Sequence, residues 1–209
     1  MLVYWLFLAF PSLMALVYPA NAGPRMRRPG QDYAFALFLL LYVVIGALRY
    51  QTGGDWLNYE NMYDEIRLDD LSFALTFTDP LFGALMWVSS AIGLGLPLVY
   101  AVCCYLLGLG VIRVARQFDD PWMAVVIAVP YLLIVVGFGY VRQAAAIGLV
   151  LMAASSLVRA NTLRTGTLLV MATLFHSSAV ITLPLFMFSI ARRRKGLAGV
   201  GHRDGGPPF

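Results

Sequence analysis

Seven apolar stretches fill most of this 209-residue chain, and their length is the feature that most limits its fold. They cover residues 2–18, 33–48, 80–95, 97–112, 122–138, 143–158 and 167–190. Charged residues make up 12% of the sequence, about half of the roughly 25% that is usual in soluble domains. A membrane-crossing helix needs about 20 mostly apolar residues. The sequence therefore predicts an all-α fold, a polytopic transmembrane helical bundle.

Short groups of basic residues beside the apolar stretches predict how the chain is oriented. They are Arg25, Arg27, Arg28, Arg113, Arg116, Arg159, Arg164, Arg192, Arg193, Arg194 and Lys195. Such groups usually lie on the cytoplasmic side of a membrane. The segment 49–79 instead holds seven of the eleven acidic residues, so we expect it to face outside. The net charge of +4 comes from these topology signals and does not indicate nucleic-acid binding.

The sides of the membrane predicted for the charged segments also imply that two apolar stretches do not cross it as single full-length helices. Only one crossing fits between the outward segment 49–79 and Arg113, yet two stretches lie there, and we expect 80–95 to be re-entrant or interfacial. Gly93, Gly95 and Pro97 mark the break after it. The stretch 167–190 has basic residues at both ends and is too short for two full crossings. A broken hairpin or a single tilted helix would fit it. The predicted bundle thus has one or two re-entrant or broken helices.

The ends of the chain set the predicted domain boundaries. Residues 1–22 end in an Ala-Asn-Ala pattern that resembles a signal-peptide cleavage site, but no basic residue precedes the apolar run, so we interpret it as a first membrane helix. We expect one integral membrane domain over residues 1–195. Residues 196–209 are rich in Gly and Pro and are predicted to be a disordered tail.

The outward segment contains an acidic residue in a turn. Gly53-Gly54 favours a tight turn, and Asp55 follows it. Asp55 could be the N-cap of the next helix, or a carboxylate at the mouth of an outward cavity. The next helix has an apolar face, formed by Trp56, Tyr59, Met62, Tyr63 and Ile66, that we expect to lie in the membrane interface. Arg49, just before the turn, could reach the lipid head groups or bind a phosphate.

Arg142 and His176 stand within apolar sequence, where ionisable groups are costly and usually functional. Arg142 is followed by Gln143 and could lie at the interface or bind a phosphate with its five donors. His176 precedes Ser177 and could be a satisfied buried histidine or a proton-transfer group. A hairpin turning at His176-Ser177-Ser178 would bring His176 to the same side of the membrane as Asp55 and Arg142. No metal site is expected, because the other histidine, His202, lies in the tail and Cys103 and Cys104 stand in an apolar run.

Four ordered motifs in this sequence resemble those of the EpsG family of bacterial exopolysaccharide synthesis. They are RYQTGGDWLNY (49–59), DPLF (79–82), YVRQAAA (140–146) and FHSSA (175–179). This family is similar to Wzy-type O-antigen polymerases. Asp79 stands where family members often carry Glu.

The resemblance implies a multi-pass protein of the bacterial cytoplasmic membrane that extends a glycan on the outer face. The implied partners are a polyprenyl-pyrophosphate-linked oligosaccharide, membrane lipid and other exopolysaccharide synthesis proteins. We expect Asp55, Arg142 and His176 to be catalytic, with Arg49, Tyr59, Gln143 and Ser177 binding the substrate. No cofactor is expected. A transporter or flippase of the lipid-linked glycan is an alternative. So is an inactive, truncated polymerase, because family members commonly continue with more helices after the histidine motif.

Overall fold

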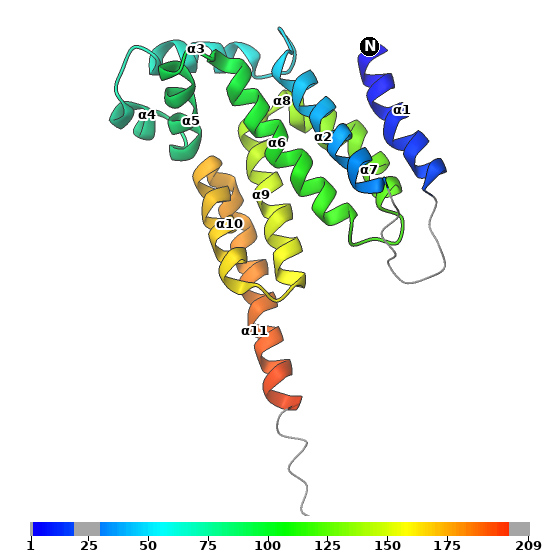
Figure 1. The fold of residues 1–209 in the computed structure, drawn as a ribbon. Helices are drawn as coiled ribbons and strands as arrows, with labels where there is room; N and C mark the ends of the chain where they lie inside the picture. The colour runs from blue at the N-terminus through cyan, green and yellow to red at the C-terminus, as the bar shows by residue number, and fades with distance from the viewer. Residues whose placement is uncertain (1, 19–29, 201–209) are drawn as a thin grey trace, which may run out of the picture.

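The computed structural model describes residues 2–18 and 30–200, with side chains as far as Arg192, and these residues confirm the predicted all-α fold (Figure 1). Its elements are α1 (Leu2–Val17), α2 (Gln31–Ala47), α3 (Trp56–Ile66), α4 (Leu71–Phe77), α5 (Pro80–Ala91), α6 (Gly95–Ala115), α7 (Pro121–Ala128), the π-helix η1 (Val129–Val136), α8 (Gly137–Gly139), α9 (Val141–Val158), α10 (Thr162–Phe175), the 3-10 helix η2 (Ser177–Thr182) and α11 (Leu183–Val200). The predicted signal Arg25, Arg27 and Arg28 lies outside the described residues.

Three helical segments are long and apolar enough to cross a membrane. They are Gly95–Ala115, Pro121–Gly139 and Val141–Val158. The second consists of α7, η1 and α8 in continuous succession, with the π-helix in its middle. At a rise of about 1.5 Å per residue, the 21 residues of α6 extend roughly 30 Å, the thickness of a hydrocarbon core.

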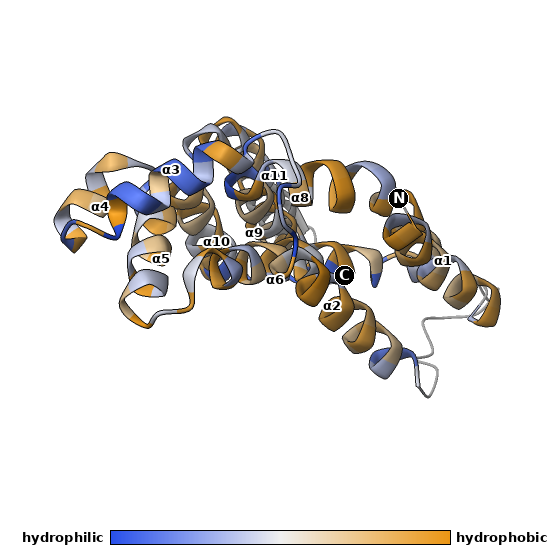
Figure 2. Ribbon diagram, turned by 90° about the horizontal axis from the view of Figure 1, so that it is seen from above, coloured by the Kyte–Doolittle hydropathy of each residue, from blue (hydrophilic) through white to orange (hydrophobic). Residues whose placement is uncertain are grey.

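The helices pack in a row around α6 and α9. Helix α9 lies between α6 and α10, α2 packs on the other side of α6, and α1 packs against α7 (Figure 1). Helices α3, α4 and α5 lie together near one end of this row. Hydrophilic residues are concentrated on α3, whereas α1 and α2 are largely hydrophobic (Figure 2). The polar end of the bundle is therefore the end formed by the segment 49–79.

Helices α6 and α9 pack closely where two glycines face each other. A Cβ atom on Gly110 would overlap the backbone of Gly148, and one on Gly148 would overlap the backbone of Leu106. Small residues at helix crossings let the backbones approach closely, as is common in membrane proteins. Because both helices contribute to both hydrophobic cores of the bundle, this contact fixes the frame on which the other helices pack.

Helix α5 agrees with the prediction that stretch 80–95 does not cross on its own. Its 12 residues extend only about 18 Å, well short of the roughly 30 Å core. The helix ends at the predicted break, where Gly93 and Gly95 both have positive φ angles. Ser89, fully buried on α5, donates a hydrogen bond to the Gly95 carbonyl and holds this turn together.

The predicted break at His176 is also present. Helix α10 ends at Phe175, His176 is extended, and η2 begins at Ser177. The chain turns back here, so that α11 leads toward the end of the molecule where α10 begins (Figure 1). Of the two interpretations of the last apolar stretch, the broken hairpin is the one that the fold adopts.

One prediction for local structure needs correction. The apolar face of α3 is not a free lipid-facing anchor: Tyr59 and Ile66 are almost fully buried in a core shared with α5 and α6, because Phe82 and Tyr100 pack on it. The predicted boundary between the membrane domain (1–195) and the tail (196–209) stays a prediction. Helix α11 continues to Val200, since no proline interrupts residues 196–200, and residues 201–209 lie outside the described part of the chain.

Candidate functional site

Asp79 is the centre of a charged cluster that joins three separate parts of the chain. Its Oδ2 lies 3.4 Å from Arg142 Nη1 and 3.2 Å from His176 Nδ1. Its Oδ1 accepts a hydrogen bond of 3.0 Å from the Ser177 backbone N–H. Only 13% of the Asp79 side chain is exposed, against 24% for Arg142 and 26% for His176. One carboxylate therefore holds a guanidinium and an imidazole together at a partly buried position.

Each member of the cluster stands where a helix starts or stops. Asp79 directly precedes α5, whose first residue is Pro80. Tyr140, with φ −132° and ψ 69°, separates α8 from α9 and puts Arg142 in the first turn of α9. His176 follows the last residue of α10. Contacts of α5 with α10 and of α10 with α9 bring these three helix ends together.

The position of Arg142 is electrostatically unfavourable without a nearby anion. The N-terminus of a helix carries a partial positive charge, which disfavours a cation in the first turn. Asp79 offsets this, and Nη1 of Arg142 also donates to Thr78 Oγ1 at 3.0 Å. The Nε atom of Arg142 is buried and has no hydrogen-bond partner among the described residues. One N–H of the guanidinium is thus left without an acceptor among the described residues.

Asp55 reaches this cluster through Tyr59. Asp55 occupies the N-cap position of α3, one of the two roles considered for it, but its side chain makes no capping hydrogen bond. Its Oδ2 instead lies 3.4 Å from the hydroxyl of Tyr59, a long and weak hydrogen bond. Burial raises the pKa of the Tyr59 hydroxyl to about 12, the Asp55 carboxylate adds to the rise, and the charge of Arg142 opposes it. Tyr59 therefore remains a protonated donor at neutral pH.

Arg49 is tied into the same end of the molecule by contacts of its own. Its guanidinium donates to the Phe138 carbonyl and lies over the ring of Tyr100, 4.1 Å from the centroid. Tyr59 packs between Tyr100 and Phe82, at centroid distances of 6.5 and 5.7 Å. The guanidinium of Arg142 lies 5.8 Å from the Phe82 centroid. A layer of aromatic rings thus links the two arginines.

The remaining predicted site residues are less involved. Gln143 is exposed beside Arg142 and makes no side-chain hydrogen bond among the described residues. Ser177 contributes its backbone N–H to Asp79, and its side chain is exposed. Within residues 2–18 and 30–200, no group of three His, Cys, Asp or Glu side chains could hold a metal ion.

Asp79 is the site residue that the sequence analysis missed. It appeared there as one of seven outward acids and as the first residue of a motif, not as a member of the site. The signal that could have singled it out is its position: an acidic residue directly before Pro80 and a long apolar stretch. A carboxylate there lies at the start of an apolar helix, next to residues that pack in the bundle.

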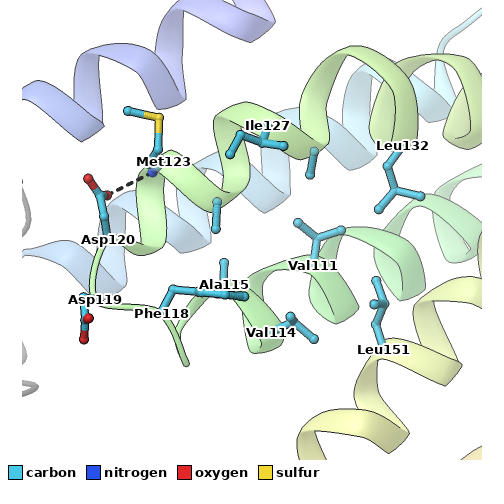
Figure 3. A pocket seen from close by; sticks show the side chains of 12 residues that line it. Val111, Val114, Ala115, Phe118, Asp119, Asp120, Met123, Ile127, Leu132 and Leu151 are labelled. Atoms are coloured by element: carbon cyan, nitrogen blue, oxygen red, sulfur yellow. Dashed lines mark hydrogen bonds between the residues drawn. The ribbon is translucent and has the colours of Figure 1, made fainter.

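An apolar pocket lies away from the Asp79 cluster, between α6, α7 and α9 (Figure 3). Its volume is about 510 Å³, and residues such as Val111, Ile127 and Leu132 make its lining almost entirely apolar. The carboxylate of Asp120 at its edge caps α7 by accepting the Met123 N–H at 2.9 Å. This pocket has no paired acid and base, so the Asp79 cluster is the better candidate for chemistry.

The four motifs that contribute to this end of the bundle match a known family. The sequence profile of the EpsG family matches residues 32–198. The chain belongs to the EpsG family. Comparison with curated proteins and with solved structures gives no match. Membership of the EpsG family and the three long apolar helices together make this a membrane protein of polysaccharide synthesis.

The geometry explains why this EpsG-family chain carries its four motifs in separate segments. Residues 49–59 supply Arg49, Asp55 and Tyr59, while residues 79–82 supply Asp79 and Phe82. Arg142 and His176 come from the third and fourth motifs. The cluster has a partly exposed cation, an imidazole held by a carboxylate, and an aromatic layer beneath them. Such an arrangement can stabilise negative charge and accept a proton.

Proposed function

We propose that this EpsG-family chain is a polysaccharide polymerase that joins lipid-pyrophosphate-linked oligosaccharide repeat units. It acts as a multi-pass protein at the outer face of the bacterial cytoplasmic membrane, with a polyprenyl-pyrophosphate-linked oligosaccharide as donor and a second lipid-linked unit as acceptor. The observation that carries the proposal is the bridge through Asp79, which places one cation and one imidazole on the same carboxylate.

Arg142 stabilises the leaving group. Negative charge grows on the pyrophosphate as its bond to the anomeric carbon breaks, and a preorganised guanidinium in a partly dry site stabilises that charge. Asp79 holds the guanidinium of Arg142 at a partly exposed position, which supports this role. Arg49 also has a buried Nε without a partner, but its guanidinium donates to the Phe138 carbonyl and lies over the Tyr100 ring, so its part is to position the loop before α3.

His176 activates the acceptor hydroxyl. With Nδ1 donating its proton to Asp79, Nε2 carries the free lone pair that a general base needs. The hydroxyl oxygen forms its bond to the anomeric carbon of the donor as the bond from that carbon to the pyrophosphate oxygen breaks. The electron pair leaves with the lipid pyrophosphate, and the hydroxyl proton passes to Nε2. Asp55 acts indirectly, because its carboxylate accepts a hydrogen bond from the Tyr59 hydroxyl.

The test is polymerisation by the purified protein in liposomes that contain the lipid-linked repeat unit. Arg142→Ala and His176→Ala should each reduce polymer formation by about a hundredfold or more, the usual range for an electrostatic stabiliser and for a catalytic base. Arg67→Ala is the matched control, because Arg67 lies at the same end of the bundle but pairs with Asp64 on the exposed surface of α3. Full-length polymer from both site variants contradicts the proposal.

The same liposomes separate the polymerase from a flippase. A flippase moves the glycan between leaflets without lengthening it, and it needs Arg142 to bind the pyrophosphate but no base. Transport that survives His176→Ala, with no change in glycan length, would therefore replace the polymerase assignment. Wild-type protein that binds the repeat unit but neither lengthens nor moves it would assign a non-catalytic role.

A further inference from the structure

A second polar pocket lies where α6 and α9 end and α10 begins. It is lined by Arg113, Ser155, Ser156, Arg159 and Arg164, and its volume is about 80 Å³. That is well below the roughly 300–1,000 Å³ of a typical drug-sized site, and it suits a group no larger than a few waters. The Asp79 cluster lies at the other ends of α9 and α10, so this pocket is separate from it.

Three arginines from three elements meet here without a carboxylate. Arg113 comes from the last turn of α6, Arg159 directly follows α9, and Arg164 is in the first turn of α10. None forms a salt bridge with an acidic side chain in the described part of the chain. Nη1 of Arg113 has only the Met152 sulfur, a weak acceptor, at 3.4 Å. Like charges held this close repel one another unless an anion lies between them.

A neighbouring arginine shows the contrast. Arg116, one turn beyond Arg113, pairs with Asp32 at the start of α2 at a distance of 2.8 Å and lies over the ring of Phe35. An arginine that serves only as a topology signal can thus be neutralised by a local acid or spread into solvent. The three pocket arginines have no such acid among the described residues, and all three line one small cavity.

Two buried serines form the wall of the same cavity. Ser155 and Ser156 are only 4% and 5% exposed, and both line the pocket. Neither hydroxyl makes a hydrogen bond to another described residue. Because both residues line the cavity, their hydroxyls can donate to a ligand inside it. The oxygens of a phosphate would accept from both.

The backbone at the start of α10 adds a partial positive charge beside the pocket. Ala160 has a positive φ of 59°, which turns the chain sharply after α9 and starts α10 within two residues. Asn161 caps α10 by accepting the Arg164 N–H at 3.0 Å. The N-terminus of this 14-residue helix attracts anions, in addition to the arginines.

We propose that Arg113, Arg159, Arg164, Ser155 and Ser156 form a binding site for a phosphate-type anion. Its ligand is either the phosphate group of an anionic phospholipid or a free phosphate, since both present the same oxygens to arginine and serine. The proposal goes beyond the polymerase function and does not depend on it, because the pocket lies at the other end of α9 from Arg142.

The experiment uses the full-length protein in neutral detergent micelles, with the thermal unfolding temperature as readout. One arm titrates inorganic phosphate against chloride at matched ionic strength. The other arm adds phosphatidylglycerol, with phosphatidylcholine as its neutral counterpart. We expect a saturable rise in the unfolding temperature in at least one arm. A rise with phosphatidylglycerol alone identifies a lipid head group, and a rise with inorganic phosphate in its own arm identifies a free phosphate as a ligand.

Variants show whether the effect belongs to this pocket. Arg159→Ala and Arg164→Ala should each weaken the apparent affinity by about tenfold or more, as expected for a charge-assisted hydrogen bond. Both residues are exposed, so their truncation leaves the core intact. Arg192→Ala, an exposed arginine on α11, removes the same charge outside the pocket and should bind like the wild type. No response in either arm, or an equal response in all three variants, would overturn the proposal.

Discussion

At the scale of single residues, Asp79 determines how the charged cluster is arranged. Without its carboxylate, the guanidinium of Arg142 would stand alone in the first turn of α9, and the ring of His176 would lose the acceptor that orients it. An amide cannot replace both, because it carries no charge to pair with arginine. Asp79 is thus a positioning residue, which acts on the substrate through its two neighbours.

We expect Asp79→Asn to lower polymer formation by about tenfold or more, because it removes the charge and keeps the shape. Asp79→Glu should restore most of the activity, since it returns the carboxylate. Polymerisation in liposomes measures both variants. Asp64→Asn is the matched control, because Asp64 is an exposed acid on α3 that pairs only with Arg67 among the described residues. Equal activity of the Asn and Glu variants would mean that charge at residue 79 has no role.

Tyr59 provides a pH-dependent prediction. Burial first, and the nearby Asp55 carboxylate second, raise the pKa of its hydroxyl from its usual value near 10 to about 12. Between these two values the unfolded chain loses the Tyr59 proton while the folded protein keeps it. The contribution of the protonated Tyr59 side chain to the free energy of unfolding is therefore complete below pH 10, and it is lost as the pH rises toward 12. Two pKa units correspond to roughly 2–3 kcal/mol of unfolding free energy.

Thermal unfolding in neutral detergent at several values between pH 9 and 12 would measure this loss. Tyr59→Phe should show a shallower decrease over this range than the wild type, because it has no proton to lose at this position. Tyr33→Phe should decrease as the wild type does, since Tyr33 is 83% exposed. Identical curves for all three proteins would be inconsistent with a buried, protonated Tyr59.

At the scale of elements, the crossing of α6 and α9 controls where Arg142 lies. The two backbones approach at Gly110 and Gly148, and α9 carries Arg142 in its first turn. A methyl group at residue 148 would meet the Leu106 carbonyl and push the helices apart. Overpacking of this kind usually costs about 1–3 kcal/mol.

Gly148→Ala should therefore lower the thermal unfolding temperature and also reduce polymer formation. Gly166→Ala on α10 is the matched control, because a Cβ there would meet no atom within 4 Å. That variant should be neutral or more stable by up to about 1 kcal/mol, from its better helix propensity. A Gly148→Ala protein as stable and active as the wild type would show that this contact tolerates expansion.

The elements also show what the sequence could and could not predict. The apolar stretches, the glycines at 93 and 95 and the polar turn at His176 are local signals, and the helices and breaks that they predicted are present. The pairing of Asp79 with His176 joins residues 97 positions apart, so no local pattern contains it. The apolar face of α3 was recognised, but its partner was not, because a face that packs on α5 looks the same in sequence as one that lies in lipid.

At the scale of the whole molecule, charge is divided between the two ends of the bundle. The end formed by residues 49–79 holds most of the acidic residues, together with the Asp79 cluster. The opposite end holds Arg113, Arg159 and Arg164, beside the starts of α7 and α10. Since cytoplasmic loops are enriched in Arg and Lys, the arginine-rich end should face the cytoplasm.

Cysteine labelling tests this orientation directly. Asn58 on α3 and Thr162 at the start of α10 are both exposed and lie at opposite ends of the bundle. We expect Asn58→Cys to react with a membrane-impermeant maleimide on bacterial cells whose cell wall has been removed and whose cytoplasmic membrane is intact. Thr162→Cys should react only after the membrane is permeabilised. The wild-type protein is the control, because its two thiols, Cys103 and Cys104, are buried and should react slowly in either state.

Labelling of both substituted cysteines from the same side would place the Asp79 cluster and the arginine pocket on one face. A reversed pattern would put the cluster in the cytoplasm, where an outer-face polymerase cannot have its site.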